Sequence, residues 1–353
     1  MTRREFVGGA AALAAAGAPR LADAAKPPQE MRAVLFQWGN NMWGEALPND
    51  VKSIKGGRLC HDHVRFDEAL WRKLVDHAVR RGLNTVLIDL GEFPVYPSRP
   101  ELAVKGSKSP DWIRAEVRRL KSLGLEPIPK LNFSTAHDAW LGEYGRMVTT
   151  RPYYDACRDV IRDAAEMFDH PRYLHIGYDE ESASHQKGFQ CVRTDEVWWH
   201  DFLWFVKTVE DARMRPWMWS DYGWKHDDFV EKCPKSVLHS NWYYDEWIEG
   251  FDLAAMKPDA RSRPILELYL KLDKAGFDQV PCASNWMSGM RERLNAGNDE
   301  CMAKLAKFCR ANISPERLKG FLVASWSLDC RSKDFMRKNT DAIDQLADAS
   351  DRT

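Results

Sequence analysis

The sequence lacks an excess of charge of either sign. Its 353 residues include 51 Lys and Arg and 52 Asp and Glu, so the formal net charge is −1. Such a balance gives no bulk electrostatic attraction to nucleic acid or to an anionic membrane surface. We therefore expect no nucleic-acid partner, and the composition favours a small neutral substrate.

Long hydrophobic runs are missing as well, and no stretch is long enough to span a bilayer as a helix. The N-terminus carries only a short run of Ala and Gly, preceded by Arg3, Arg4 and Phe6. This pattern is typical of a twin-arginine signal peptide, and Ala22-Asp23-Ala24 supplies a small-x-small cleavage site. We expect residues 1–24 to export a bacterial protein to the periplasm or the medium. An ordinary frayed N-terminal helix is the alternative.

The eight cysteines lack the spacing of a metal or redox site. They stand at positions 60, 157, 191, 233, 282, 301, 309 and 330, with no CxxC pair and no metal-ligand spacing. We expect buried thiols. An even number in an exported chain permits disulfides, but the spacing does not select their partners.

What the sequence does contain is a regular alternation of short β-rich runs with longer segments of helical period. We expect eight strands, at Ala33–Trp38, Thr85–Leu90, Pro127–Phe133, Tyr173–Tyr178, Pro216–Ser220, Val237–Trp242, Val280–Asn285 and Gly320–Trp326. The helical segments are Asp67–Arg81, Pro110–Leu123, Tyr153–Phe168, Asp195–Ala212, Ile265–Ala275, Cys301–Cys309 and Asp334–Leu346. Several of them are followed by a glycine of the C-cap type.

Eight βα units without a Pro-, Gly- or Ser-rich linker predict an α/β fold with one closed (β/α)8 TIM barrel. We expect this barrel to fill residues 25–353 as a single domain. A doubly wound open sheet is the rival, but the first expected strand is followed by GNNMWG and not by a glycine-rich phosphate loop. In a TIM barrel the active site lies at the carboxyl ends of the strands.

Carboxylates, amides and indoles dominate those expected strand ends. They are Gln37 and Trp38, Asp89 and Glu92, Asn132 and His137, Asp179 and Glu180, Trp219 and Asp221, Asn241 to Asp245, Asn285 and Trp286, and Trp326. Five of the eight strands end in or beside a Trp, and the chain has 15 Trp in total. Flat apolar faces with a polar edge suit sugar rings, although each Trp alone would fit equally well as packing at the barrel mouth.

The fourth strand carries the sharpest signal, because YLHIGYDE ends in two consecutive carboxyls, Asp179 and Glu180. Acids at this point can also cap the next helix. However, two neighbouring like charges with aromatic neighbours cannot both ionise cheaply, so one should retain its proton near neutral pH. A protonated acid beside an ionised one is what cleavage of a glycosidic bond requires.

These motifs resemble glycoside hydrolase family 20, the β-N-acetylhexosaminidases, and more loosely family 123. HIGYDE is similar to the family's H-x-G-x-D-E, and SNWYYD resembles its W-Y-x-D segment. Weaker likenesses are MWSD at the fifth expected strand and GFLVASWSL at the eighth. We expect the family's small domain before the barrel to be absent, because the first expected strand begins only a few residues after the expected signal.

The resemblance implies a mechanism in which the substrate's own 2-acetamido oxygen is the nucleophile and an oxazolinium ion forms. It implies that Glu180 is the general acid and later the base, that Asp179 holds the acetamido N–H, and that Tyr243 orients the acetamido carbonyl. It also implies a carbohydrate partner and no cofactor or metal. The sugar would lie among side chains at the barrel mouth: Trp219, Trp242, Trp286, Trp326 and His137.

Two departures from the family pattern bear on specificity. The family's Arg after the first strand is missing in FQWGNN, and Leu328 stands where the family has a Glu after the last-strand Trp. Recognition of the outer hydroxyls would have to be rebuilt, with candidates at Gln37, Asn132, Asp221 and Asn285. We therefore expect an exo-acting enzyme with a weak preference for N-acetylgalactosamine over N-acetylglucosamine.

Three alternatives remain at this stage. A conventional retaining glycosidase would keep Glu180 as the acid and use Glu92, Asp221 or Asp245 as the nucleophile. Cys60-His61-Asp62-His63 could bind a divalent metal in a deacetylase-like hydrolase, although no third ligand cluster is evident. A barrel that binds carbohydrate without catalysis is the third. The sequence leaves the oligomeric state open.

Overall fold

The computed structural model describes residues 30–42, 60–182, 192–327 and 330–351. The expected signal at residues 1–24, together with Cys191 and Leu328, lies outside these described residues. Within them, the five buried cysteines, Cys157, Cys233, Cys282, Cys301 and Cys309, are free thiols, and Cys60 and Cys330 are partly exposed. No helix of the described part combines the length and apolar character needed to cross a bilayer.

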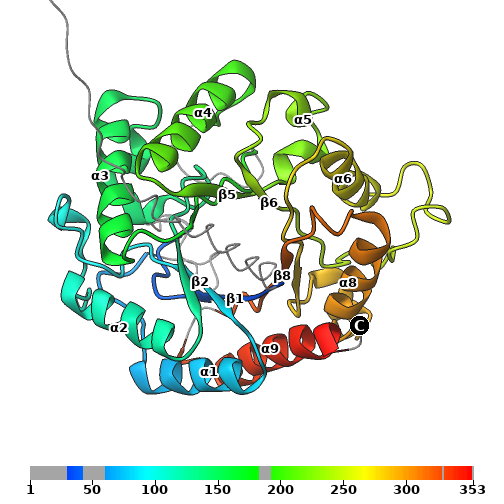
Figure 1. The fold of residues 1–353 in the computed structure, drawn as a ribbon, viewed down its shortest axis with the longest axis horizontal. Coiled ribbons are helices and arrows are strands. Elements are labelled where there is room, and N and C mark those ends of the chain that lie inside the picture. Colours follow the sequence, from blue (N-terminus) through cyan, green and yellow to red (C-terminus); the bar gives the residue numbers. More distant parts are fainter. Residues whose placement is uncertain (1–29, 43–59, 183–191, 328–329, 352–353) are drawn as a thin grey trace, which may run out of the picture. The chain divides into compact units, whose positions relative to one another are not determined.

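Eight parallel strands form the centre of the fold, as the sequence predicts (Figure 1). They are β1 (Met31–Gln37), β2 (Thr85–Asp89), β3 (Glu126–Lys130), β4 (Tyr173–His175), β5 (Arg215–Trp219), β6 (Leu238–Ser240), β7 (Cys282–Ser284) and β8 (Gly320–Ala324). Their order is β6-β5-β4-β3-β2-β1-β8-β7. Isolated parallel bridges, His239 to Gln279 and Trp242 to Cys282, join the two outer strands and close the barrel.

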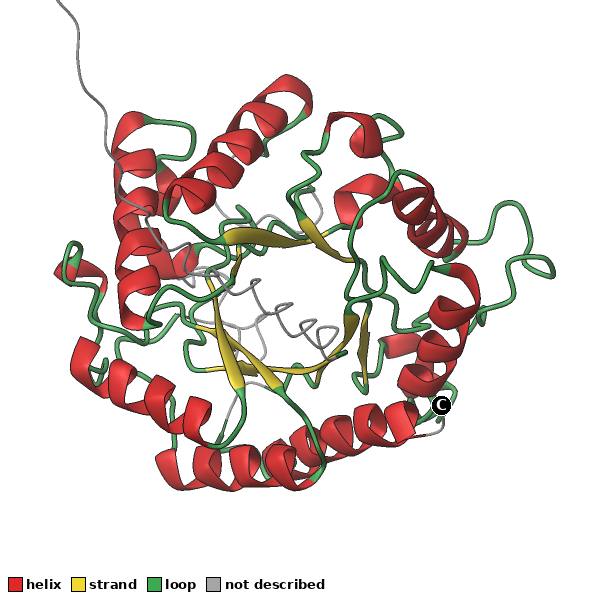
Figure 2. Cartoon of the chain, viewed as in Figure 1, coloured by secondary structure: helices red, strands yellow, loops and turns green. Residues whose placement is uncertain are grey.

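Helices surround the strands as an outer ring (Figure 2). The longer ones are α1 (Glu68–Arg80), α2 (Pro110–Ser122), α3 (Arg151–Met167), α4 (Asp195–Asp211), α6 (Arg263–Lys274), α8 (Cys301–Asn312) and α9 (Phe335–Asp351). Two short helices that the sequence analysis did not predict, α5 (Phe229–Lys232) and α7 (Gly289–Arg293), lie in loops. The side chain of Asp67 caps the start of α1, and that of Ser109 caps the start of α2 ahead of Pro110.

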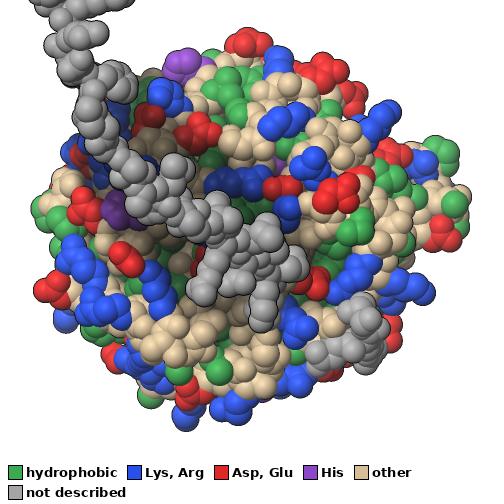
Figure 3. Space-filling view, viewed as in Figure 1, with side chains coloured by type: hydrophobic (Ala, Val, Ile, Leu, Met, Phe, Trp, Pro, Cys, Tyr) green, Lys and Arg blue, Asp and Glu red, His purple; other side chains and the backbone are tan. Residues whose placement is uncertain are grey.

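Alternation along each strand divides the apolar residues into two cores. Leu35, Leu87 and Leu322 belong to an inner cluster, whereas their neighbours Phe36, Ile88 and Val323 pack in the larger cluster between strands and helices. Residues that pair across neighbouring strands therefore face the same side of the sheet. The polar residues that follow the inward-facing apolar residues at the carboxyl ends of the strands form the barrel mouth. On the face drawn in Figure 3, Lys and Arg side chains are mixed with Asp and Glu.

Several strands end earlier than predicted, and β4 is the clearest case. It stops at His175 and not at Tyr178, because the backbone turns into positive φ at Gly177 (φ 70) and Tyr178 (φ 74). Such angles are incompatible with a pleated strand. Only the first residue of the motif HIGYDE, His175, thus belongs to the strand, and the other five form the turn after it.

Candidate active site

The turn after β4 carries the two consecutive carboxyls into the barrel mouth. Its shape depends on Gly177, because a Cβ there would lie 2.0 Å from Oδ1 of Asn132. Glu180 also has a positive φ of 57. Unfavourable backbone angles in ordinary residues are found where the surrounding structure enforces them, and they cluster at functional sites.

Asp179 and Glu180 share contacts from the segment after β3. Asn132 Nδ2 donates to Asp179 Oδ1 at 2.9 Å. His137 Nε2 lies 3.0 Å from Glu180 Oε2 and 3.4 Å from Asp179 Oδ2. The structure therefore brings together four residues that the sequence analysis assigned to the site. The Glu180 side chain is 30% exposed and Asp179 only 15%, so Glu180 is the more accessible acid.

His137 and Asp179 carry opposite charges at neutral pH. Burial alone would lower the pKa of His137, but the carboxylates of Asp179 and Glu180 outweigh it and raise this pKa to about 10. Burial alone would raise the pKa of Asp179, but the charges of His137 and Lys130 and the hydrogen bond from Asn132 lower it well below its usual range. His137 is accordingly a cation and Asp179 an anion at neutral pH.

A third carboxyl, Asp221, stands beside the pair at the end of β5, at the start of the 3-10 turn Asp221–Trp224. Its Oδ2 accepts the backbone N–H of Glu180 at 2.9 Å, and its Oδ1 accepts the indole N–H of Trp242 at 3.4 Å. Burial and then the negative charges of Asp179 and Glu180 raise the pKa of Asp221 to about 7. The structure thus places Asp221, which the sequence analysis named for hydroxyl recognition and as an alternative nucleophile, beside the expected pair, half protonated near neutral pH.

A buried ionic network behind the pair was not anticipated from the sequence. Glu181 accepts hydrogen bonds from the backbone N–H and the hydroxyl of Thr135, at 2.8 and 3.0 Å. Arg193 binds Glu181 at 2.5 Å, Asp201 at 3.2 Å and the carbonyl oxygen of Phe133 at 2.7 Å. This network ties the loop that carries His137 to the residue that follows Glu180. The only sequence signal was a third consecutive acid.

Aromatic side chains surround the pair on the side of β5, β6 and β8. Trp219, Trp242 and Trp326 all pack in or against the inner cluster. The Trp219 and Trp326 rings have centroids 6.1 Å apart. The other two expected tryptophans differ: Trp286 is 37% exposed on the β7 loop, and Trp38 is fully buried in the outer cluster.

The two consecutive tyrosines after β6 face opposite sides. The Tyr243 hydroxyl is 2.8 Å from the carbonyl oxygen of Gly250 and 3.0 Å from Asp245, and its ring packs in the outer cluster. The Tyr244 ring instead stacks on Trp242 at 5.1 Å, and its hydroxyl accepts the indole N–H of Trp326 at 3.0 Å. Tyr244, not Tyr243, lies with the mouth tryptophans. Counting alternate residues inward from Leu238 would have selected it.

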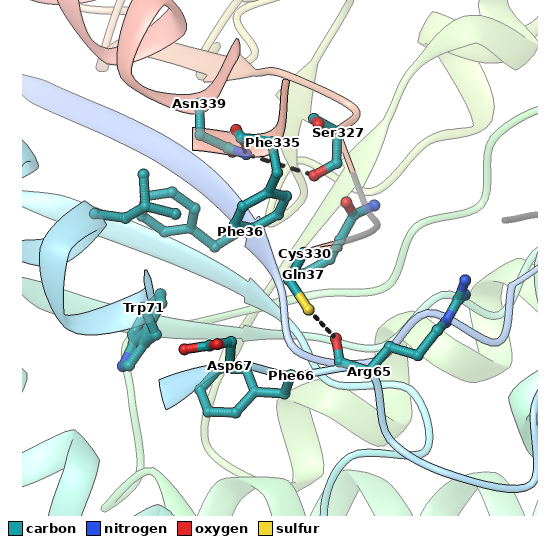
Figure 4. A pocket seen from close by; sticks show the side chains of 11 residues that line it. Phe36, Gln37, Arg65, Phe66, Asp67, Trp71, Ser327, Cys330, Phe335 and Asn339 are labelled. Atoms are coloured by element: carbon teal, nitrogen blue, oxygen red, sulfur yellow. Dashed lines mark hydrogen bonds between the residues drawn. The ribbon is translucent and has the colours of Figure 1, made fainter. Parts of the chain in front are cut away.

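Two of the residues proposed for hydroxyl recognition, Asn285 and Gln37, make contacts outside the barrel mouth. Asn285 donates to the carbonyl oxygen of Lys338 on α9, at 2.8 Å, so its amide contacts the helix layer. Gln37 ends β1 in register with Asp89 but also lines a small pocket between β1, α1 and α9. Figure 4 shows this pocket, with Phe36, Trp71 and Phe335 among its walls. Neither Asp179 nor Glu180 lines it, so it is separate from the catalytic group.

The carboxyls named for the alternative mechanism occupy different surroundings. Glu92 is buried, and its two oxygens accept the backbone N–H groups of Asn40 and Asn41. Asp245 is paired with Arg291 at 2.9 Å. Both therefore have structural partners, and Asp221 alone among the three contacts the catalytic turn.

One group of described residues has the spacing of a metal site. His137, Asp179 and Glu180 each offer a ligand atom within 4.8 Å of the others. These atoms already hydrogen-bond to one another, and a protonated imidazole has no lone pair for a metal. In the described part of the chain, Cys60 to His63 gathers no such group of three, and His63 pairs instead with Asp62. The cluster is suited to moving protons.

Comparisons with known proteins place the fold. No protein-family model and no curated protein matches the sequence. Among solved structures, a family 20 exo-β-N-acetylglucosaminidase from Vibrio harveyi, in complex with N-acetylglucosamine, superposes with a TM-score of 0.57 at 13% identity, covering 92% of this chain and 57% of that one. The N-acetyl-β-hexosaminidase of Streptomyces plicatus superposes with a TM-score of 0.56 at 15% identity, covering 91% and 64%.

This chain thus spans less than two thirds of the length of those two enzymes. A family 5 glycoside hydrolase from Prevotella bryantii, in complex with a xyloglucan oligosaccharide, also superposes, with a TM-score of 0.52 at 12% identity over 90% of this chain and 95% of that one. One barrel can serve different chemistries, so the likeness speaks for architecture. At these identities it establishes that the chain folds as a (β/α)8 barrel of the kind found in family 20 glycoside hydrolases.

Proposed function

We propose that this protein is a retaining exo-β-N-acetylhexosaminidase in which the substrate's acetamido group is the nucleophile. The observation that carries the proposal is the group at the end of β4: an ionised Asp179 and an accessible Glu180, joined by one imidazolium from His137. Tryptophans at the barrel mouth supply apolar walls beside it. The likeness to family 20 barrels supports the same assignment.

Each group has a defined task in this reaction. Glu180 protonates the glycosidic oxygen as the bond breaks and afterwards accepts a proton from the attacking water. The Asp179 carboxylate accepts the acetamido N–H and stabilises the positive charge of the oxazolinium ion. We assign the contact with the acetamido carbonyl to Tyr244, because its ring lies against Trp242 and its hydroxyl against Trp326.

A conventional retaining glycosidase is the second candidate, with Asp221 as nucleophile. The proximity of Asp221 to Glu180 favours this mechanism. The pKa of about 7 disfavours it, because a nucleophilic carboxylate must be ionised. The hydrogen bond from the Glu180 backbone also holds Asp221 beside the acid, whereas a retaining pair lies on opposite sides of the scissile bond.

Four aryl glycosides separate these readings: β-N-acetylgalactosaminide, β-N-acetylglucosaminide, β-galactoside and β-glucoside. Only the two acetamido sugars should be hydrolysed, with kcat/KM somewhat higher for the galacto form. Equal rates on all four would remove acetamido participation. Glu180→Gln serves as the catalytic control: it should lose about 10²–10⁴-fold on a poor leaving group and much less on an activated one.

We further infer that residues 1–24 direct export through the twin-arginine route, because Arg3 and Arg4 precede a short apolar run. Fractionation of a bacterial host should find the mature protein outside the cytoplasm. Replacing both arginines by lysine should retain it inside. Unchanged export of that variant would contradict the inference.

A further inference from the structure

Beneath the catalytic carboxyls lies an ion pair that the mechanism above does not use. Lys130, the last residue of β3, binds the carboxylate of Asp89, the last residue of β2, and the two side chains are only 1% and 2% exposed. The register pairs Asp89 with Lys130 and Lys130 with His175, so the three belong to one inward-facing level of the barrel. An ammonium group is rarely buried so completely unless it is paired.

Lys130 of this level acts electrostatically on Asp179. Lys130 and Asn132 are two residues apart on β3 and its extension, so both point into the barrel. Asn132 is the residue that donates to Asp179 Oδ1. On the neighbouring strand, β4 ends at His175, and the turn through Gly177 and Tyr178 brings Asp179 to Asn132. Lys130 therefore lies two residues from the amide that holds the Asp179 carboxylate.

We propose that Lys130 is a positioning residue of the active site: held in place by Asp89, its fixed positive charge keeps Asp179 ionised while Glu180 cycles between acid and base. The inference rests on the proposed function, because the ionised Asp179 matters for an attacking acetamido group. It assigns a role to a residue that the family likeness does not single out.

The surroundings of Asp179 indicate why a fixed charge is needed. The titratable groups that face it are His137, Lys130, Asp89, His175, Asp221, Tyr244 and the adjacent Glu180. Only Lys130 and His137 among them carry positive charge at neutral pH, since burial and the charge of Lys130 lower the pKa of His175. His137 is shared with Glu180, whose charge changes in every catalytic cycle. Lys130 is bonded instead to Asp89.

The test compares three variants over a range of pH. Lys130→Met removes the positive charge and should move the acidic limb of kcat/KM upward by about one to three pH units, because an ionised Asp179 is required and its pKa rises. Lys130→Arg keeps the charge and should leave the limb near its wild-type position. Asp89→Asn removes a negative charge from the same level and should leave the limb in place or move it downward.

A purely structural ion pair predicts a different pattern. Loss of either partner would then destabilise the protein. Lys130→Met and Asp89→Asn would both lower kcat/KM and leave the acidic limb of its pH profile in place, or they would both shift this limb in the same direction. Either of these patterns overturns the proposal. Thermal unfolding and circular dichroism of each variant identify the pH range in which it is folded, and rates are compared only there.

A titration that does not depend on turnover separates this inference from the proposed function. The Asp side chains are labelled with ¹³C at Cγ, and the Asp179 signal is identified by its loss in Asp179→Asn. The titration midpoint of Asp179 should rise in Lys130→Met and stay near the wild-type value in Lys130→Arg. If no hexosaminide is hydrolysed but the midpoint moves, the proposed function fails and the electrostatic role of Lys130 stands. An unmoved midpoint in Lys130→Met refutes that role.

Discussion

His137 Nε2 lies 3.0 Å from Glu180 Oε2 and 3.4 Å from Asp179 Oδ2, so a single imidazole joins two consecutive carboxyls. The imidazole is 5% exposed, and the charges of both partners raise its pKa to about 10 despite burial. A cation between two acids offsets their mutual repulsion.

The stability contributed by His137 should depend on pH in a definite direction. Its pKa is about 10 in the folded protein and 6.5 in a model peptide, so the contribution is fully present below 6.5 and is lost as the pH rises through 10. We expect His137→Gln to unfold more easily than the wild type at pH 6, by a few kcal/mol. The difference should vanish above pH 10. Urea unfolding of both proteins at pH 6, 8 and 10.5 measures it.

A neighbouring histidine provides the control for this experiment. His175 is also buried, but burial and the charge of Lys130 keep its pKa well below 6.5, so it is neutral across this range. The destabilisation caused by His175→Gln should not change between pH 6 and 10.5. A pH-independent loss in His137→Gln would contradict the charge assigned to that imidazole.

Gly177 should be indispensable for the shape of the catalytic turn. Gly177→Ala brings a Cβ to within 2.0 Å of Asn132 Oδ1, at a φ of 70 that already disfavours alanine. The Asn132 side chain must then move away from Asp179. We expect at least a tenfold fall in kcat/KM together with lower stability, measured on the same preparation.

Gly124→Ala is the matched control for that variant. Gly124 follows α2 with a φ of 81, and a Cβ there meets nothing within 4 Å. It therefore reports only the backbone cost of about 1–2 kcal/mol for a left-handed alanine. Gly124→Ala should lose stability but retain full activity. If the two variants lost the same stability and activity, the clash with Asn132 would be irrelevant.

The two tyrosines after β6 offer another matched pair. Tyr244→Phe removes the oxygen that accepts the Trp326 indole N–H, next to the catalytic group. We expect it to lower kcat/KM for the acetamido sugar about tenfold or more while the fold persists. Tyr243→Phe removes a buried hydrogen bond to Gly250 and should cost about 1 kcal/mol of stability with little change in kcat. The opposite result would restore Tyr243 to the site.

These tyrosines also illustrate what the sequence could and could not predict. The barrel could be predicted because strand-like runs alternate with segments of helical period along the chain. The same hydrophobic pattern recurs in every βα unit. The candidate pair Asp179 and Glu180 could be located from its position at the end of β4, because active sites of such barrels lie at the carboxyl ends of the strands. Whether Tyr243 or Tyr244 faces the inside of the barrel depends on which residue of β6 is the first to point inward. A shift of one residue in this assignment exchanges the two tyrosines.

Contacts across long separations were beyond the sequence. Arg193 reaches the carbonyl oxygen of Phe133, 60 residues away, and Lys130 reaches Asp89 across 41 residues. Nothing in the sequence distinguishes Arg193 or Lys130 from the other arginines and lysines of the chain. Only the closed barrel brings their partners within reach. The raised pKa of Asp221 has the same origin, since it depends on burial at the barrel mouth and then on charges from a neighbouring strand end.

Arg193 should be the largest single contributor to the stability of the site outside the apolar core. It is fully buried and joins Glu181, Asp201 and the backbone of the His137 loop. Arg193→Met leaves two buried carboxylates without their cation, and a loss of about 3–5 kcal/mol is expected in urea unfolding. Adding Glu181→Gln removes one of those charges and should recover part of the loss. Arg337→Met, at an exposed arginine paired with Asp334, should have little effect. Equal losses in the two arginine variants would show that the buried network does not hold the loop.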